Sequence, residues 1–134
     1  MQVEAVLHLA GEAESEAARQ RLSQLSRALE LDAHLGKRRT ELSGGQRKRV
    51  ALLTGLAVPR ALLIADEPTA GLDAANAMRV LQTLTMVAHQ DQSAVLIATH
   101  DTKAARQAGF DIVAISEGQL APRLSVSGQM QHND

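Results

Sequence analysis

The sequence predicts an α/β domain whose core is a parallel sheet preceded by a helical segment. Two apolar runs, 61–65 and 94–99, are too short for buried helices and indicate strands. The residues between them, 74–88, carry apolar side chains at helical spacing. Because a strand, a helix and a second strand follow one another, the helix is expected to cross over and leave the two strands parallel.

Composition excludes several classes of protein. The chain has 134 residues, of which 45% are hydrophobic and 22% charged, as in a globular domain. It has no cysteine, which excludes a disulfide scaffold and thiolate metal sites. The net charge of -1 gives no general attraction to nucleic acid, so no nucleic-acid partner is expected. No apolar run approaches the roughly 20 residues that span a bilayer, and no signal peptide is visible, so we expect a cytoplasmic protein.

The first predicted element is an amphipathic helix over 12–31. Its apolar side chains recur on one face, at Leu22, Leu25 and Leu29, and its residues are mostly good helix formers. A polar connector over 32–41 follows it.

The second helix begins at the stretch Leu42-Ser43-Gly44-Gly45-Gln46 and ends before Pro59. Its inward side chains are expected to be Val50, Leu53 and Ala57. The glycines allow close approach of a ligand to the backbone, and a serine-led helix start offers free N–H groups to an anion.

Three cations, Arg47, Lys48 and Arg49, occupy the first turn of this second helix. Cations at a helix N-terminus are unfavourable by about 0.3–1 kcal/mol each. A docked anion would offset that cost, so the cluster predicts an anion site. The alternative is a serine-capped helix with a solvated basic face.

The strands at 61–65 and 94–99 show no polar alternation, so both are predicted to be buried on both faces. A short helix over 102–108 is expected to lead to a third strand, 111–115. A turn at Glu117-Gly118 follows this strand, and the polar tail 122–134 is expected to be loose.

Titratable side chains come directly after two of these strands. Asp66 and Glu67 follow the first strand, and His100 follows the second. Ligands bind at the carboxyl ends of the strands in open parallel sheets. The set suits metal-assisted hydrolysis: Asp66 would hold Mg²⁺ through water, Glu67 would orient or deprotonate a water, and His100 would sense a phosphate oxygen. The alternative is a solvated strand end.

The order of these motifs resembles the ATP-binding cassette (ABC) ATPases. L-S-G-G-Q is similar to their signature motif, L-L-I-A-D to the Walker B strand, A-G-L-D to the D-loop and A-T-H-D to the switch-histidine segment. The resemblance implies a catalytic Glu67 and switch His100, a metal-binding Asp66, and contacts to nucleotide from Ser43, Gly44, Gly45, Gln46 and Asp73.

The resemblance covers about residues 3–121 and implies part of a P-loop NTPase (RecA-like) core with most of the ABC helical subdomain. Residues 3–45 would be the helical subdomain ending in the signature motif, 46–121 the second half of the ATPase core, and 122–134 a tail. The motif forms look most like the subfamily serving lipoprotein release, macrolide export and cell division.

The cofactors implied by the resemblance are ATP and Mg²⁺. The implied partners are a second ATP-binding cassette, which completes a dimer sandwich, and a transmembrane permease subunit. The protein would then be cytoplasmic and peripheral on the inner face of the cell membrane.

The 134 residues contain no phosphate loop of the form G-x-x-x-x-G-K-[ST]. The one Gly-Lys pair, Gly36-Lys37, is followed by Arg38, and Leu31 stands where the first glycine would be. We therefore expect an N-terminally truncated ABC-type ATPase that is inactive alone.

Two alternative functions are also compatible with the sequence. One is the C-terminal lobe of a DNA-repair or chromosome-maintenance ATPase, which the lack of a sustained heptad pattern disfavours. The other is a non-catalytic protein that lends its signature face to another cassette, in which case Glu67 would be dispensable.

Overall fold

The computed structural model describes residues 15–120, and its helices match the predicted ones closely. The tail expected at 122–134 and the first residues of the predicted helical subdomain, 3–14, lie outside these described residues. The elements in chain order are α2 (Glu16–Ala28), the short 3-10 turns η1 (Asp32–His34) and η2 (Arg39–Glu41), α3 (Gly44–Leu56), β1 (Leu62–Asp66), α4 (Ala74–Asp91), β2 (Ala94–Ala98), α5 (Thr102–Gln107), β3 (Ile115–Ser116) and β4 (Gln119–Leu120).

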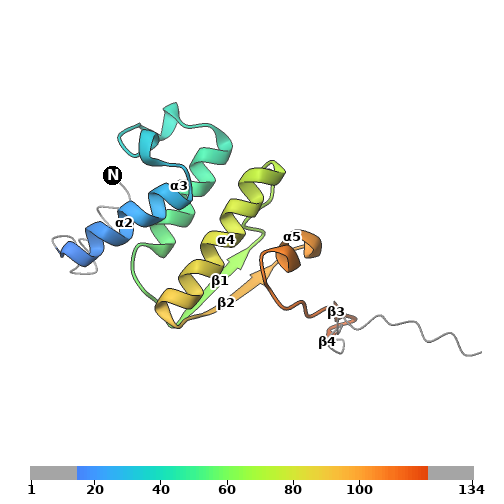
Figure 1. Ribbon diagram of the computed structural model, residues 1–134. Helices are drawn as coiled ribbons and strands as arrows, with labels where there is room; N and C mark the ends of the chain where they lie inside the picture. Colours follow the sequence, from blue (N-terminus) through green and yellow to red (C-terminus); the bar gives the residue numbers. More distant parts are fainter. Residues whose placement is uncertain (1–14, 121–134) are drawn as a thin grey trace, which may run out of the picture.

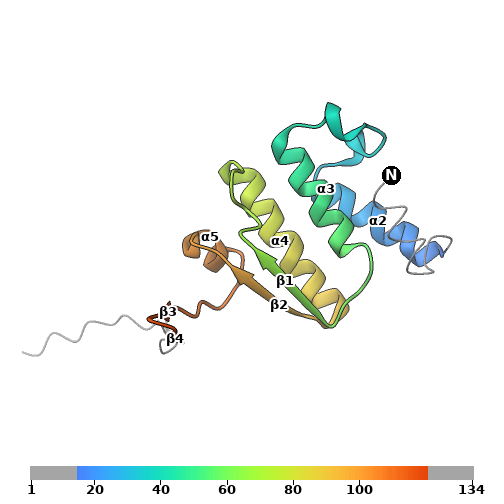
Figure 2. The same cartoon turned by 180° about the vertical axis from the view of Figure 1, so that it is seen from behind.

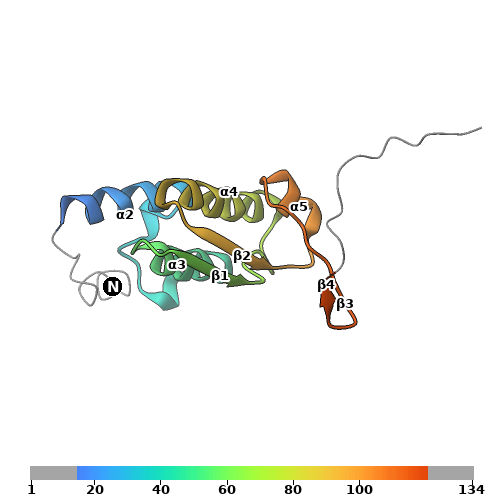
Figure 3. The ribbon, with the colours of Figure 1, turned by 90° about the horizontal axis from the view of Figure 1, so that it is seen from below.

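Strands β1 and β2 pair in parallel, as the sequence predicted, with a register that runs from Leu62 opposite Ala94 to Asp66 opposite Ala98. Helix α4 makes the crossover between them and runs along one face of the pair (Figures 1 and 3). This unit brings the residue after β1 close to the residues after β2.

Helices α2, α3 and α4 share one apolar core (Figure 1). The inward side chains predicted for the first two helices are buried or half-buried there. The largest fully buried members are Leu25, Leu29, Leu31, Leu53, Leu56, Leu84, Val80 and Val87.

A polar contact also joins these three helices. Both terminal nitrogens of Arg21 in α2 donate to the carboxylate of Asp91 at the end of α4, each at 2.7 Å. The Arg21 Nε donates to the Leu56 carbonyl of α3 at 2.8 Å. The Arg21 and Asp91 side chains are only 15% and 8% exposed, so this ion pair is largely shielded from water.

The prediction that both strands are buried on both faces is wrong. Leu62, Ile64 and Leu96 are 54%, 71% and 60% exposed, because α4 covers only the opposite face. An uninterrupted apolar run is compatible with burial on both faces of a strand. Burial of the second face also requires another element that packs against it. Among the described residues, nothing covers this outer face.

The prediction of a third strand over 111–115 is also wrong. Residues 111–114 have no regular structure, and Ile115–Ser116 pairs instead with Gln119–Leu120 in an antiparallel hairpin. The predicted turn at Glu117-Gly118 closes this hairpin, with both residues at positive φ. The hairpin lies away from α2 and α3 (Figures 1 and 2). A strand needs a neighbouring strand, and within the described residues no strand lies beside 111–114.

No helix between residues 15 and 120 combines the length and the apolarity that crossing a membrane requires.

Candidate functional site

The site lies where β1 and β2 end. The backbone N–H of Glu67 donates to the Ala98 carbonyl at 2.8 Å, which continues the parallel pairing one residue beyond β1. His100 follows two residues after Ala98. The parallel register therefore places Glu67 and His100 at the same rim of the sheet, as the sequence predicted.

The Glu67 and His100 side chains are in direct contact. The Oε1 of Glu67 lies 2.9 Å from the Nδ1 of His100, and their side chains are 38% and 82% exposed. The hydrogen bond from His100 lowers the pKa of the Glu67 carboxyl. The same bond, and then the negative charge of Glu67, raises the pKa of His100. Both shifts favour an ionised carboxylate beside a protonated imidazole.

Glu67 adopts an unusual backbone conformation, with φ of 44° in the left-handed region. For a residue with a Cβ this conformation costs roughly 1–2 kcal/mol. The second carboxylate oxygen, Oε2, is buried and has no hydrogen-bond partner among the described protein atoms. A buried, ionised oxygen without a donor is costly. Water can reach Glu67 only at the exposed part of its side chain, which is 38% exposed overall.

Asp66 lies on the exposed face of β1, with Leu62 and Ile64. No group of three or more His, Asp or Glu side chains that could hold a metal ion is found between residues 15 and 120. Magnesium is commonly bound through one or two carboxylates together with substrate phosphates and waters. Asp66 fits that kind of site and not an all-protein metal site.

The signature stretch forms the start of α3. The Ser43 Oγ accepts from the Gln46 backbone N–H at 3.2 Å, and the Ser43 N–H donates to the Gln46 Oε1 at 2.9 Å. This reciprocal capping box defines the helix start that the sequence predicted. A Cβ on Gly45 would lie 3.2 Å from the Cδ2 of Leu72, so a glycine allows α3 to approach the A-G-L-D turn closely.

The basic cluster has internal partners. Arg47 donates to the Leu42 carbonyl at 2.6 Å, Lys48 donates to the Ala70 carbonyl, and Arg49, 8% exposed, donates to the Leu29 carbonyl at 3.0 Å. These contacts account for three cations at a helix start without the anion that the sequence pattern predicts.

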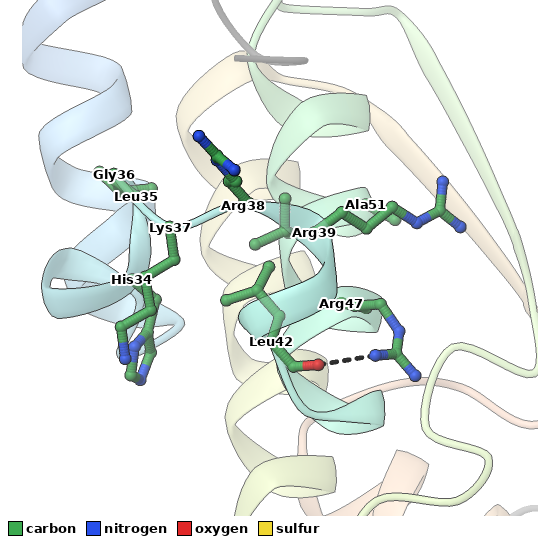
Figure 4. A pocket seen from close by; sticks show the side chains of 10 residues that line it. His34, Leu35, Gly36, Lys37, Arg38, Arg39, Leu42, Arg47 and Ala51 are labelled. Carbon is green, nitrogen blue, oxygen red and sulfur yellow. Dashed lines mark hydrogen bonds between the residues drawn. The ribbon is translucent and has the colours of Figure 1, made fainter.

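Figure 4 shows the Arg47 contact at the edge of a cavity of about 760 Å³ between the η1–η2 connector and α3. The guanidinium groups drawn there point in different directions and do not converge on one point.

Asp73 caps the next helix. Its Oδ1 accepts from the Asn76 backbone N–H at 3.0 Å, and its Oδ2 accepts from the Asn76 side-chain amide at 2.5 Å. The backbone bond first, and then the side-chain bond, lowers the pKa of Asp73. The sequence pattern indicates Asp73 but not Asn76, because an asparagine in a first helical turn carries no distinctive pattern.

The described residues thus form two separate groups. Glu67 and His100 contact each other at the strand ends, while Ser43, Gly45 and Asp73 belong to the adjoining start of α3 and the A-G-L-D turn. Among the described side chains, no hydrogen bond joins the signature stretch to Glu67 or His100.

Comparison with known proteins gives these two groups a context. The family model described as ABC transporter matches residues 2–70. The chain is 38% identical over 114 residues to the lipoprotein-releasing system ATP-binding protein LolD 2 of Caulobacter vibrioides, across 85% of this chain and 49% of that protein. It is 35% identical over 112 residues to the macrolide export ATP-binding/permease protein MacB of Syntrophobacter fumaroxidans, across 84% of this chain and 16% of that protein.

The similar solved structures are also ATP-binding cassettes. A dimeric ATP-binding cassette in a post-hydrolysis state, bound to ADP and Pi, is similar with a TM-score of 0.69 and 29% identity. The similarity covers 90% of this chain and 54% of that chain. An ATP-binding subunit of an ABC transporter gives the same TM-score at 25% identity, over 90% of this chain and 51% of that one. This chain therefore spans about half, or less, of the proteins it is similar to.

Proposed function

The chain belongs to the ABC transporter family of ATP-binding subunits, and on that premise we propose that it supplies the hydrolytic residues of one ATP site and the signature residues of a second. The observation that carries the proposal is the contact between Glu67 and His100, 2.9 Å apart at the ends of two parallel strands.

Glu67 is proposed as the general base. His100 keeps its carboxylate ionised, and the Glu67 side chain, 38% exposed, is accessible to an attacking water. A protonated His100 uses Nδ1 to donate to Glu67, which leaves its Nε2–H to donate to a phosphate oxygen. The pair therefore holds a water and a phosphate group side by side.

Asp66 is proposed to hold Mg²⁺ together with the phosphates of ATP. When bound, the metal would neutralise charge that develops on the phosphate oxygens. Asp66 is exposed at the end of β1, next in the chain to Glu67, so its carboxylate is accessible to such an ion. Its proposed role is binding and orientation only.

The signature residues and Asp73 are proposed to act on a second cassette. Ser43, Gly44, Gly45, Gln46 and Asp73 would contact the nucleotide held by the opposite subunit of a dimer. The N-terminus of α3, as the positive end of a helix dipole, suits a phosphate there. The dimeric state of one structural relative supports this arrangement.

The proposed partners are a second cassette and a transmembrane permease subunit, which would hold the protein at the inner face of the cell membrane. The names of the relatives point to export or release of a lipoprotein or a macrolide-like molecule. They favour a transporter over a DNA-repair ATPase. We assign residues 3–45 to the helical subdomain and 46–121 to the second half of the core.

The 134 residues by themselves are proposed to be inactive. They include Asp66 and Glu67 but no G-x-x-x-x-G-K-[ST] loop, so the isolated chain would present negative charge to a negative ligand. Activity requires a phosphate-binding segment from elsewhere.

The test joins residues 1–134 to a phosphate-binding segment from the Caulobacter relative. Glu67→Gln is expected to lower ATP turnover by about 10²–10⁴-fold, because it removes a base, and to leave ATP binding intact. Glu16→Gln, the same change at an exposed position in α2, is the control. ATPase activity of Glu67→Gln within a few-fold of the parent would favour a chain that only lends its signature face.

A further inference from the structure

A buried cation links the signature helix to the D-loop turn. Arg49 in α3 is 8% exposed, and its Nη1 donates to the Leu29 carbonyl at 3.0 Å and to the Asn76 Oδ1 at 2.6 Å. No salt bridge to Arg49 is found in the described part of the chain. A buried guanidinium is costly unless polar groups solvate it, so these two oxygen atoms determine where it sits.

The Asn76 amide has one favourable orientation. Its oxygen accepts from Arg49 and also from the Arg79 Nη1 at 3.2 Å, while its NH₂ group donates to the Asp73 Oδ2 at 2.5 Å. A flipped amide would turn its NH₂ toward two guanidinium groups and its oxygen toward a carboxylate. Every one of those contacts would be repulsive.

Two further contacts join the same parts of the fold. The Lys48 Nζ donates to the Ala70 carbonyl, and Gly45 packs against Leu72. Helix α3 therefore contacts the segment 70–76 at three successive places. A displacement of either part would have to break all three contacts.

We propose that Arg49 and Asn76 are positioning residues that lock the start of α3 to the Asp73 turn, so that the signature motif and the D-loop move as one unit. Arg49 sets the orientation of the Asn76 amide, and the amide fixes the Asp73 carboxylate. Neither residue needs to touch nucleotide. This deepens the proposed function and rests on it, because Asp73 is assigned a role at a partner cassette only there. The signature motif and the D-loop would then contact that cassette as one surface.

The test uses the 134-residue chain labelled with ¹⁵N and ¹³C and needs no nucleotide. Asn76→Ala removes the amide but keeps the backbone N–H that caps α4, so the pKa of Asp73 is expected to rise toward its ordinary value. Arg49→Met keeps a long apolar stem and removes the guanidinium. The Asp73 pKa is expected to rise here too, and the Asn76 side-chain amide protons should exchange about tenfold faster.

Arg19→Met is the matched control, because it makes the same change at an exposed position in α2, and among the described residues Arg19 has no hydrogen bond to Asn76. It should leave the Asp73 pKa unchanged. A purely structural role for Arg49 would lower stability without moving the Asp73 pKa in the folded chain. An unchanged Asp73 pKa in folded Asn76→Ala and Arg49→Met would overturn the proposal.

If Arg49→Met does not fold, amide rotation in the wild-type chain tests the proposal. The Asn76 amide should rotate about its C–N bond at least about tenfold more slowly than the exposed Gln82 amide, and equal rates would contradict the locking. Because no measurement involves ATP, failure here leaves the proposed ATPase role standing. An unaffected Glu67→Gln enzyme would overturn that role instead.

Discussion

The Nδ1 of His100 lies 2.9 Å from the Oε1 of Glu67, although the two residues are 33 positions apart in the sequence. The contact exists because Glu67 continues the β1–β2 ladder through its bond to Ala98. It accounts for the opposite pKa shifts of the two side chains and forms the basis of the first prediction.

His100 should titrate above the ordinary histidine value of 6.5, and Glu67→Gln should return its pKa toward that value. An NMR titration of the wild-type chain and of Glu67→Gln compares the two His100 values directly. A His100 pKa that does not respond to Glu67→Gln would contradict the contact.

The same pair should contribute to stability within a limited pH range. Its contribution is fully present above the ordinary Glu pKa of 4.5 and below the ordinary His pKa of 6.5. It is lost as pH falls through the lowered Glu67 pKa, or rises through the raised His100 pKa. The pH dependence of unfolding in wild type, minus that in Glu67→Gln, should show this pattern.

His100→Ala should reduce ATP turnover in a subunit that carries a phosphate-binding segment. The change removes both the donor that holds Glu67 and the proposed donor to a phosphate oxygen, so about a 100-fold loss is expected. His89→Ala, at an exposed position in the last turn of α4, is the control. Equal turnover in the two variants would remove His100 from the mechanism.

Ser43→Arg should impair a partner's site. Mixed with a wild-type cassette, it should inactivate one of the two composite sites and reduce turnover to about half or less. The change also removes an N-cap, which costs about 1 kcal/mol. Ser15→Arg removes the N-cap of α2 by the same substitution and so controls for lost capping. If both variants dimerise and hydrolyse ATP normally, the signature does not act in trans.

Arg21→Met should destabilise the chain by roughly 3–5 kcal/mol, because it leaves Asp91 buried without its partner. Replacing both residues, Arg21→Met with Asp91→Leu, should recover much of that loss. Urea unfolding measures each variant. A double variant no more stable than the single one would show that the ion pair is not the main link between α2 and α4.

The isolated 134-residue chain should bind no Mg-ATP in a calorimetric titration and should self-associate. Leu62, Ile64 and Leu96 form an exposed apolar face, and such faces favour aggregation. Ile64→Thr should lower light scattering, whereas Gln82→Thr on the outer side of α4 should not. Micromolar ATP binding by a monomeric chain would overturn the proposal that it needs a separate phosphate-binding segment.

The sequence predicted what depends on local pattern and on the geometry of parallel sheets. Helical spacing located α2, α3 and α4. The strand ends correctly brought Glu67 and His100 to one rim, because carboxyl ends of neighbouring parallel strands always share an edge. Neither conclusion needed the positions of distant side chains.

Other features could not be predicted, because they depend on what packs against an element. The sequence of an apolar run such as 61–65 is the same whether one face of the strand or both faces are covered. The sequence of 111–115 likewise does not show whether a neighbouring strand is present. The basic cluster predicted an anion site because the sequence does not show the carbonyl groups that accept from Arg47 and Arg49. Those carbonyls come close only through the fold and local turns. The roles of Arg21 and Asn76 likewise exist only in three dimensions.

The parallel register of β1 and β2 also bears on the order of events during folding. Helices form in about a microsecond from local contacts, but pairing Asp66 with Ala98 must first close the whole intervening crossover. The Glu67–His100 contact cannot form before that closure. The imidazole resonance of His100 is therefore a reporter of the late, non-local step. During synthesis the ribosome must complete β2 and add His100 before the Glu67–His100 contact can exist.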